Sequence, residues 1–236
     1  MNDYELKIKD DITVNTISKA ILNETSKLGF KRADYISLVN NLLDVSINNS
    51  ISEPKVKSET DVKTSKLKFP IRGERIQLRL FNPKHDYDII QNWLNDNTSR
   101  WFLLDRSSYR DKTLIEIIND EENIFGIISL PDNTPIGLMA FLNYDQTNCK
   151  AEMRKLIGEK IYRGKGYAKE ATMLWIKYGT RNLGLKKIYL NTIENNIRNI
   201  TLNRELGFQI EGLLRKEFLI NDQYYDVLRM AYIVED

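Results

Sequence analysis

Apolar positions in the first 48 residues recur at the spacing of helices. Val14, Ile17, Ile21 and Leu28 lie three, four and seven residues apart, which places them on one helix face. Gly29 follows as a helix stop signal. The second apolar stripe, with Asp34 near its start as a cap, comprises Tyr35, Leu38, Val39, Leu42 and Leu43. We predict a helical hairpin, an accessory region that spans residues 1–48.

Residues 49–68 form a polar segment after this hairpin. They carry mixed charge, contain Pro54 and show no sustained apolar period, so they are expected to be a linker. Chains below about 40–60 residues rarely bury enough apolar surface to fold alone. The hairpin is therefore expected to dock on the rest of the chain, to pair with a second copy as a homodimer, or to bind another partner.

Strand-like and helix-like patterns alternate in residues 69–236, the predicted second domain. Strand-like runs cover residues 75–80, 124–130, 135–143, 150–157, 187–192, 208–218 and 225–234. Helical runs cover residues 86–94, 111–119, 167–183 and 197–206. The turn at 131–134, Pro-Asp-Asn-Thr, joins two strands as a hairpin. This order predicts an α/β domain of the α+β type, with helices on the faces of a mixed sheet.

Composition narrows the classes of function. The 236 residues are 42% hydrophobic and 29% charged, which suits a globular protein. The net charge of +2 is spread evenly, so neither nucleic acid nor an anionic membrane is an expected partner. The lone Cys149 and lone His85 disfavour a disulfide, a metal site and a histidine triad, so no metal is expected. Without a signal peptide or an apolar run of about 18–20 residues, we expect a cytoplasmic protein.

A loop with two glycines, Arg-Gly-Lys-Gly-Tyr-Ala at residues 163–168, joins a predicted strand to a predicted helix. The first N–H groups of a helix are unpaired and carry partial positive charge, so they bind phosphate well. Gly166 stands where a Walker loop requires Ser or Thr, and Lys169 stands where a dinucleotide fingerprint requires Gly or Ala. These residues alone predict an anion site, with a ligand-free glycine turn as the alternative.

Five segments, in this order, carry a more specific resemblance. They are ERIQLRLFNPKHDYDIIQNWLND, PIGLMAFLNYD, AEMRKLIGEKIYRGKGYAKEA, LKKIYLNTIENNIRNITLNRELGFQIEGLLR and NDQYYDVLRMAYI. Together, over about residues 69–235, they resemble the GNAT acetyltransferases. The resembling branch includes the ribosomal-protein N-terminal acetyltransferases and the amino-sugar N-acetyltransferases. The resemblance implies a mixed, mostly antiparallel sheet flanked by helices, and acetyl transfer from acetyl-CoA to a primary amine by direct attack.

The resemblance also implies a set of residues that contact acetyl-CoA. The family pattern Q/R-x-x-G-x-G/A falls on residues 161–166, where Ile161 departs from it. The implied residues are Leu156, Ile157, Gly158, Arg163, Gly164, Lys165, Gly166, Tyr167, Ala168 and Asn196. Many members carry a tyrosine that protonates the departing thiolate, and Asn203 stands in that position here. The general acid is therefore left open.

An ammonium is not a nucleophile, so the acceptor must lose a proton. The resemblance points to Glu152 as the base and to Glu194 as the second choice. A structural or substrate-binding role for Glu152 is weighed equally. Tyr225 and Asp226 are assigned to the acceptor pocket. We expect a small-molecule or nucleotide-linked amino-sugar amine as acceptor, with a protein N-terminus, or a non-catalytic acetyl-CoA-binding regulatory module, as the alternatives.

Overall fold

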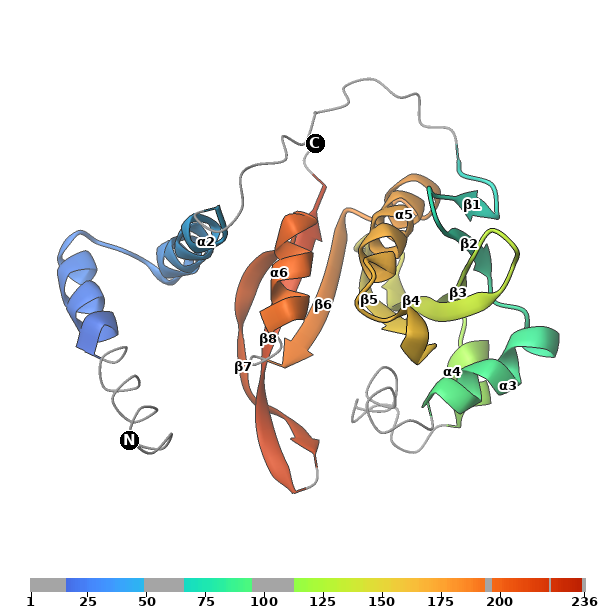
Figure 1. The fold of residues 1–236 in the computed structure, drawn as a ribbon. Coiled ribbons are helices and arrows are strands. Elements are labelled where there is room, and N and C mark those ends of the chain that lie inside the picture. The colour runs from blue at the N-terminus through green and yellow to red at the C-terminus, as the bar shows by residue number, and fades with distance from the viewer. Residues whose placement is uncertain (1–15, 49–65, 95–112, 194–196, 221, 235–236) are drawn as a thin grey trace. The chain divides into compact units, whose positions relative to one another are not determined.

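A computed structural model describes residues 16–48, 66–94, 113–193, 197–220 and 222–234 (Figure 1). The chain divides into two units, Met1–Lys55 and Val56–Asp236. Leu67 is already tied to the second unit, because its backbone N and O exchange hydrogen bonds of 2.9 and 2.8 Å with the Asn182 side chain. Each unit is described by itself below.

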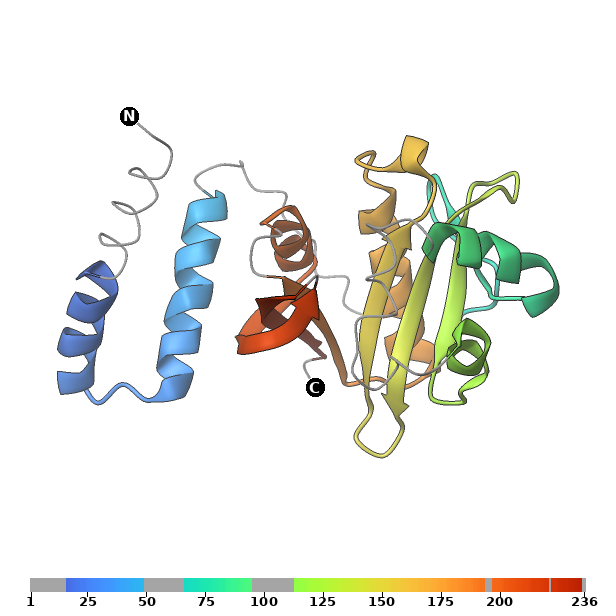
Figure 2. The ribbon, with the colours of Figure 1, turned by 90° about the horizontal axis from the view of Figure 1, so that it is seen from below.

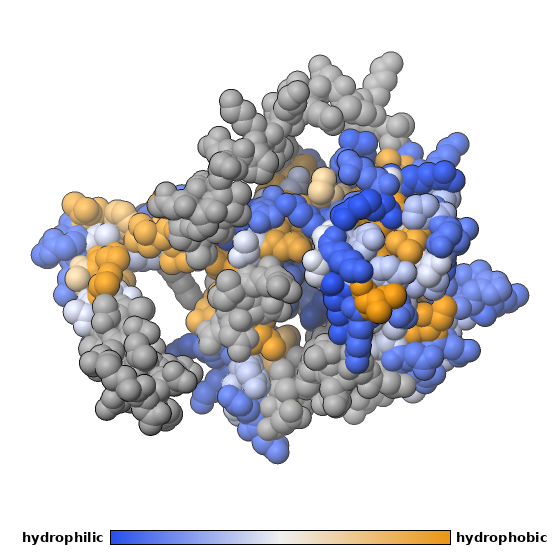
Figure 3. Space-filling model, viewed as in Figure 1, coloured by the Kyte–Doolittle hydropathy of each residue, from blue (hydrophilic) through white to orange (hydrophobic). Residues whose placement is uncertain are grey.

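The first unit contains the two helices of the predicted hairpin. Residues 16–27 are helical, and α2 spans Arg32–Asn48. Gly29 adopts φ +79° between them, and Thr25 Oγ1 donates to the Tyr35 hydroxyl at 3.0 Å. Many apolar side chains of both helices remain exposed (Figure 3). They include Ile17, Leu22, Val39, Leu42 and Val45.

The second unit is built on an eight-stranded sheet of order β1-β2-β3-β4-β5-β6-β8-β7. The strands are β1 Ile71–Arg72, β2 Gln77–Leu80, β3 Ile124–Ser129, β4 Pro135–Asp145, β5 Lys150–Ile157, β6 Lys187–Ile193, β7 Gln209–Ile220 and β8 Gln223–Ile233. Among the strand pairs of the described residues, only β5–β6 is parallel. The predicted mixed, mostly antiparallel sheet is therefore confirmed.

Helices lie on both faces of the β2–β5 half of the sheet (Figures 1 and 2). On one face α5, Tyr167–Asn182, stacks Trp175 on Phe141 of β4 with ring centroids 5.0 Å apart. This approach needs Gly126 in β3, where a Cβ atom would lie 2.6 Å from the Trp175 ring. On the opposite face, α3 (Pro83–Leu94) and α4 (Leu114–Asn119) pack Trp93 and Ile117 into the core.

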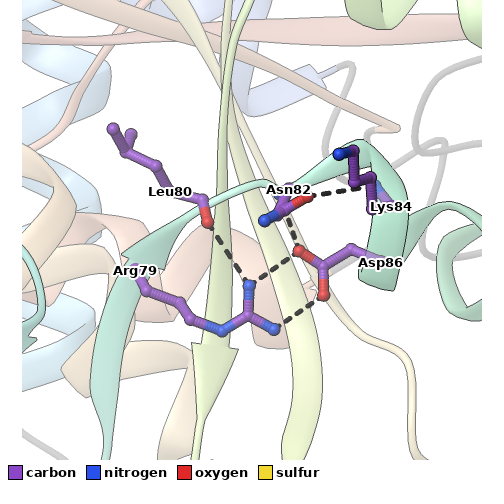
Figure 4. Close-up of polar contacts among 5 residues, drawn as sticks. All are labelled: Arg79, Leu80, Asn82, Lys84 and Asp86. Carbon is purple, nitrogen blue, oxygen red and sulfur yellow. Dashed lines mark hydrogen bonds and ion pairs between the residues drawn. The ribbon is translucent and has the colours of Figure 1, made fainter.

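An ion pair between the partly exposed Arg79 and the buried Asp86 fixes the entry to α3 (Figure 4). Arg79 in β2 donates two hydrogen bonds of 2.7 Å to the Asp86 carboxylate, which also accepts from Asn82 N at 2.8 Å. The helix begins at Pro83, three residues before the expected start, because proline is favoured at the first helical position. In α4, Thr113 and Glu116 form a capping box.

Candidate active site

The strands β5 and β6 pair only at their beginnings. The register joins residues 150–152 of β5 to residues 187–189 of β6. Beyond Glu152 and Tyr189 the two strands continue to Ile157 and Ile193 without pairing to each other, and Figure 1 shows them diverging. Backbone polar groups along these facing edges are therefore available to an extended ligand.

The glycine loop lies at the N-terminus of α5, next to this divergence. Gly164 and Gly166 have φ of +76° and +84°, and nothing lies within 4 Å of a Cβ atom built on Gly164. The backbone N–H groups of residues 164–168 donate no hydrogen bond within the described residues. A row of unpaired N–H groups at the start of a 16-residue helix is suited to a pyrophosphate.

Arg75, just before β2, braces this loop, a role that the sequence did not indicate. Its Nη1 donates to Lys165 O at 2.9 Å, and its Nε pairs with Glu170 Oε2 at 3.0 Å. The guanidinium also lies over the Tyr167 ring, 4.9 Å from the centroid. Arg75 therefore holds the loop conformation and adds positive charge beside the free N–H groups.

The end of β5 is held by two side chains. The Arg163 Nε and Nη2 donate to the carbonyl oxygens of Ile157 and Gly158 at 2.9 and 3.0 Å. On the other side, the Trp93 ring of α3 packs so closely on Gly158 that no Cβ atom would fit there. The Arg163 side chain thus orders the strand end, and the backbone N–H of Arg163 donates to Lys160 O at 3.2 Å.

Glu152 joins a polar network on the α3–α4 face of the sheet. It is fully buried and pairs with Arg154 Nη2 at 2.8 Å. Asn191 Nδ2 on β6 donates to the same Glu152 oxygen at 3.4 Å, and Arg229 Nε on β8 donates to Asn191 Oδ1 at 3.1 Å. The network spans three strands beside the divergence, and the assignment of Glu152 as the base stays a prediction.

Lys155 and Asn203 meet on the α5 face of the same divergence. The Lys155 ammonium on β5 donates to Asn203 Oδ1 on α6, which spans Ile197–Glu205. Asn203 is fully buried. Burial lowers the pKa of Lys155 from 10.5 to about 7, because the charged ammonium loses solvation. The sequence contained no signal for this contact beyond the departure at Asn203.

Of the remaining assigned residues, the structure describes Tyr225 and Asp226. Tyr225 in β8 packs on the small cluster of Phe218 and Val227, and its hydroxyl donates to Gln223. Asp226 Oδ1 accepts from the backbone N of Lys216 at 2.7 Å within the β7–β8 hairpin. Glu194 and Asn196 lie outside the described residues. Their assignments, like those of Tyr225 and Asp226, stay predictions.

Two features of the described residues concern metal binding and membrane insertion. Within the residues that the structure describes, no group of three or more His, Cys, Asp or Glu side chains is arranged to hold a metal ion. In the same part of the chain, no helix has both the length and the apolar character needed to cross a membrane.

Comparison with known proteins decides the family. The profile described as "Acetyltransferase (GNAT) domain" matches residues 75–209. An uncharacterized N-acetyltransferase p20 of Bacillus licheniformis is 32% identical over 173 residues, which cover 67% of this chain and 96% of that protein. The chain belongs to the GNAT acetyltransferase family.

Other relatives have named acceptors. Spermidine N(1)-acetyltransferase of Escherichia coli K12 is 37% identical over 100 residues, 42% of this chain. The match spans only about half, 53%, of that relative's length. A crystal structure of spermidine N-acetyltransferase from Vibrio cholerae, in complex with CoA and spermine, is 26% identical with a TM-score of 0.60. That likeness covers 67% of this chain and 95% of the other.

Proposed function

We propose that this GNAT protein transfers the acetyl group of acetyl-CoA to a primary amine of a small molecule. The observation that carries the proposal is the divergence of β5 from β6 beside a helix N-terminus with free N–H groups. A pyrophosphate and a pantetheine arm match these two features in charge and in shape. The CoA-bound relative supports the same donor.

Different residues of this chain would bind different parts of acetyl-CoA, the acetyl donor. The N–H groups of residues 164–168, braced by Arg75, would bind the pyrophosphate. The backbone of residues 156–158 would pair with the pantetheine arm, with Arg163 ordering that strand end. The amine nitrogen then bonds to the acetyl carbon, and the carbon–sulfur bond breaks. Glu152, on the opposite face, is the candidate that accepts the amine proton, directly or through water.

A polyamine is the first acceptor to test among small-molecule amines. The support comes from the relatives, which are named spermidine N-acetyltransferases. No observation favours the nucleotide-linked amino sugar or a protein N-terminus over a polyamine. These two acceptors are therefore tested beside the polyamine in the same assay. Assembly through the N-terminal helices stays a separate prediction, based on their exposed apolar side chains.

Two matched glycine variants test the donor site. Gly164 and Gly184 both have positive φ, and each has open space around its Cβ position. Gly164→Val and Gly184→Val therefore introduce similar backbone strain, but only the first places a side chain in the loop. Calorimetric titration with acetyl-CoA is expected to show at least a tenfold weaker affinity for Gly164→Val alone. Equal affinities for the two variants would contradict the loop assignment.

Thiol release separates the possible acceptors. Wild-type protein is incubated with acetyl-CoA and spermidine, a nucleotide-linked amino sugar, or a peptide with a free N-terminus, and free thiol is followed. We expect release with spermidine, and Glu152→Gln is expected to slow it while acetyl-CoA affinity is retained. Tight acetyl-CoA binding without turnover of any amine would instead favour a non-catalytic regulatory module.

A further inference from the structure

The Lys155–Asn203 pair connects β5 to α6 beside the strand divergence. Lys155 is opposite Met139 in the β4–β5 register, just as Met153 is opposite Phe141, so its side chain lies on the α5 face. It leaves β5 three residues after the last residue paired with β6 and reaches α6. The contact therefore crosses the space in which the proposed pantetheine arm would run.

Lys155 is a cation without a carboxylate at ion-pair distance among the described residues. The charged groups on neighbouring elements have other partners. Glu205 of α6 pairs with Lys169 of α5 at 2.6 Å, and Glu170 of α5 pairs with Arg75. Glu152 lies on the opposite face with Arg154. Among the described residues, no carboxylate therefore neutralises the Lys155 ammonium, which burial also desolvates.

Asn203 has capacity for a further contact. Its Oδ1 accepts from Lys155, while its buried Nδ2 has no hydrogen-bond partner within the described structure. A buried amide N–H group without a hydrogen-bond acceptor lowers the stability of the fold, unless a bound ligand accepts its hydrogen bond. Both members of the pair therefore present hydrogen-bond donors at the divergence, where the electron-rich end of a thioester would lie.

Resting on the proposed function, we propose that Lys155, oriented by Asn203, donates the proton that the CoA sulfur takes up when it leaves. The amine nitrogen forms a bond to the acetyl carbon, the carbon–sulfur bond breaks, and its electron pair goes to sulfur. One proton moves from Lys155 Nζ to sulfur, and neutral Lys155 regains a proton from solvent. The net reaction turns acetyl-CoA and an ammonium into an amide, free CoA thiol and one proton.

The pair replaces the tyrosine that many GNAT members carry at the position of Asn203. The lysine is a stronger acid than a normal lysine, since its pKa is lowered to about 7. A thiol has a pKa of about 8.5, so proton transfer from Lys155 to a thiolate is downhill. An unperturbed lysine, at about 10.4, would hold its proton against the same thiolate.

The test compares kcat and its pH dependence in wild type, Lys155→Met and Lys150→Met. Lys150 is the matched control, because it is a lysine on the same strand that pairs with Asp145 at the far end. We expect Lys155→Met to lower kcat by about 100-fold, the usual contribution of a general acid. Its KM for acetyl-CoA should stay within about threefold. In wild type, kcat should fall as pH rises through about 7, because neutral Lys155 has no proton to donate.

A rescue variant separates proton donation from a structural role. Adding Asn203→Tyr to Lys155→Met restores a side chain that can donate a proton from α6. This double variant should have a kcat at least tenfold higher than that of Lys155→Met. The pH above which its kcat decreases should move toward the pKa of tyrosine, about 10. Calorimetric affinity for acetyl-CoA confirms that each variant is folded.

The outcomes distinguish this role from the proposed function. Suppose that wild type turns over and that Lys155→Met has the same kcat and the same decrease of kcat at alkaline pH. This result would overturn the role of Lys155 but not the proposed function. Equal losses in Lys155→Met and Lys150→Met would overturn it too, because the effect would then be general charge loss. Absence of thiol release by wild type with every amine would overturn the proposed function, and the Lys155 role with it.

Discussion

The two faces of the sheet differ in how their polar groups are used where β5 leaves β6. On the α3–α4 face, Glu152, Arg154, Asn191 and Arg229 bind one another. On the α5 face, the N–H groups of the glycine loop donate to nothing within the described residues, and Lys155 contacts only an amide oxygen there. Donors without a partner among the described residues indicate a place for an anionic ligand, whereas side chains that bind one another across three strands indicate structure or a site that must rearrange.

Breaking the network on the α3–α4 face should have the largest effect on stability. Glu152→Leu removes the carboxylate that pairs with Arg154, whose side chain is 11% exposed. Removing one member of a buried pair should lower the free energy of unfolding by roughly 3 kcal/mol. Urea denaturation measures this loss. The double variant Glu152→Leu with Arg154→Met should cost less than the sum of the single changes, and strict additivity would contradict the coupling.

Overpacking beneath α3 should have the next largest effect. In Gly158→Ala the new methyl group meets the Trp93 ring, so α3 or the end of β5 must shift. The expected loss of unfolding free energy is about 1–3 kcal/mol. Gly212→Ala in β7, where nothing lies within 4 Å of the Cβ position, is the control and should stay within about 0.5 kcal/mol. Similar thermal midpoints for both variants would contradict the close packing.

Changing pH should reveal the buried charge on the α5 face. The folded-state pKa of Lys155 lies below its unfolded value, so the ammonium destabilises the fold at low pH. Between about pH 7 and pH 10, Lys155 is protonated in the unfolded chain but neutral in the folded protein. The free-energy cost of burying its charge therefore decreases as pH rises through this range. Lys155→Met should therefore be more stable than wild type at pH 6, by on the order of 1 kcal/mol.

Denaturation of wild type and Lys155→Met at matched pH values follows this difference. The stability gap between the two proteins should narrow from pH 7 to pH 9. A gap that stays constant or widens over this range would mean that Lys155 titrates normally.

Loosening the glycine loop should have the smallest effect. Arg75→Gln removes an ion pair whose arginine side chain is 49% exposed, and surface pairs contribute about 1 kcal/mol or less. Acetyl-CoA affinity should fall about fivefold at low salt and less at high salt, because salt screens the lost charge. Arg72→Gln, at an exposed position in β1, is the control. Equal losses for Arg72→Gln and Arg75→Gln would contradict a specific brace.

The glycine loop at the start of α5 could be located from the sequence because the signal is local. Gly164 and Gly166 lie within three residues of the start of α5, and strand and helix patterns on both sides locate the turn. Helix and strand positions in residues 69–236 were also largely predicted, since apolar periodicity is local. The short β1 was missed, because two residues carry no measurable period.

The contacts that complete the site join residues far apart in the chain. Arg75 and Glu170 are separated by 95 positions, and Lys155 and Asn203 by 48. In the sequence, Lys155 is an ordinary polar position on a strand, and nothing local indicates that α6 covers it. The same holds for Gly158, which has no turn to explain it and is required by Trp93 of α3.

By itself the sequence determined the family, the order of elements and the position of the glycine loop, because these follow from short-range pattern and spacing. Only the tertiary structure decided that β5 and β6 separate after Glu152 and Tyr189, and which side chains meet there. Burial and pairing are properties of the packed sheet and helices. They place Glu152 in an ion-paired network on one face, and leave Lys155 as a desolvated cation on the other.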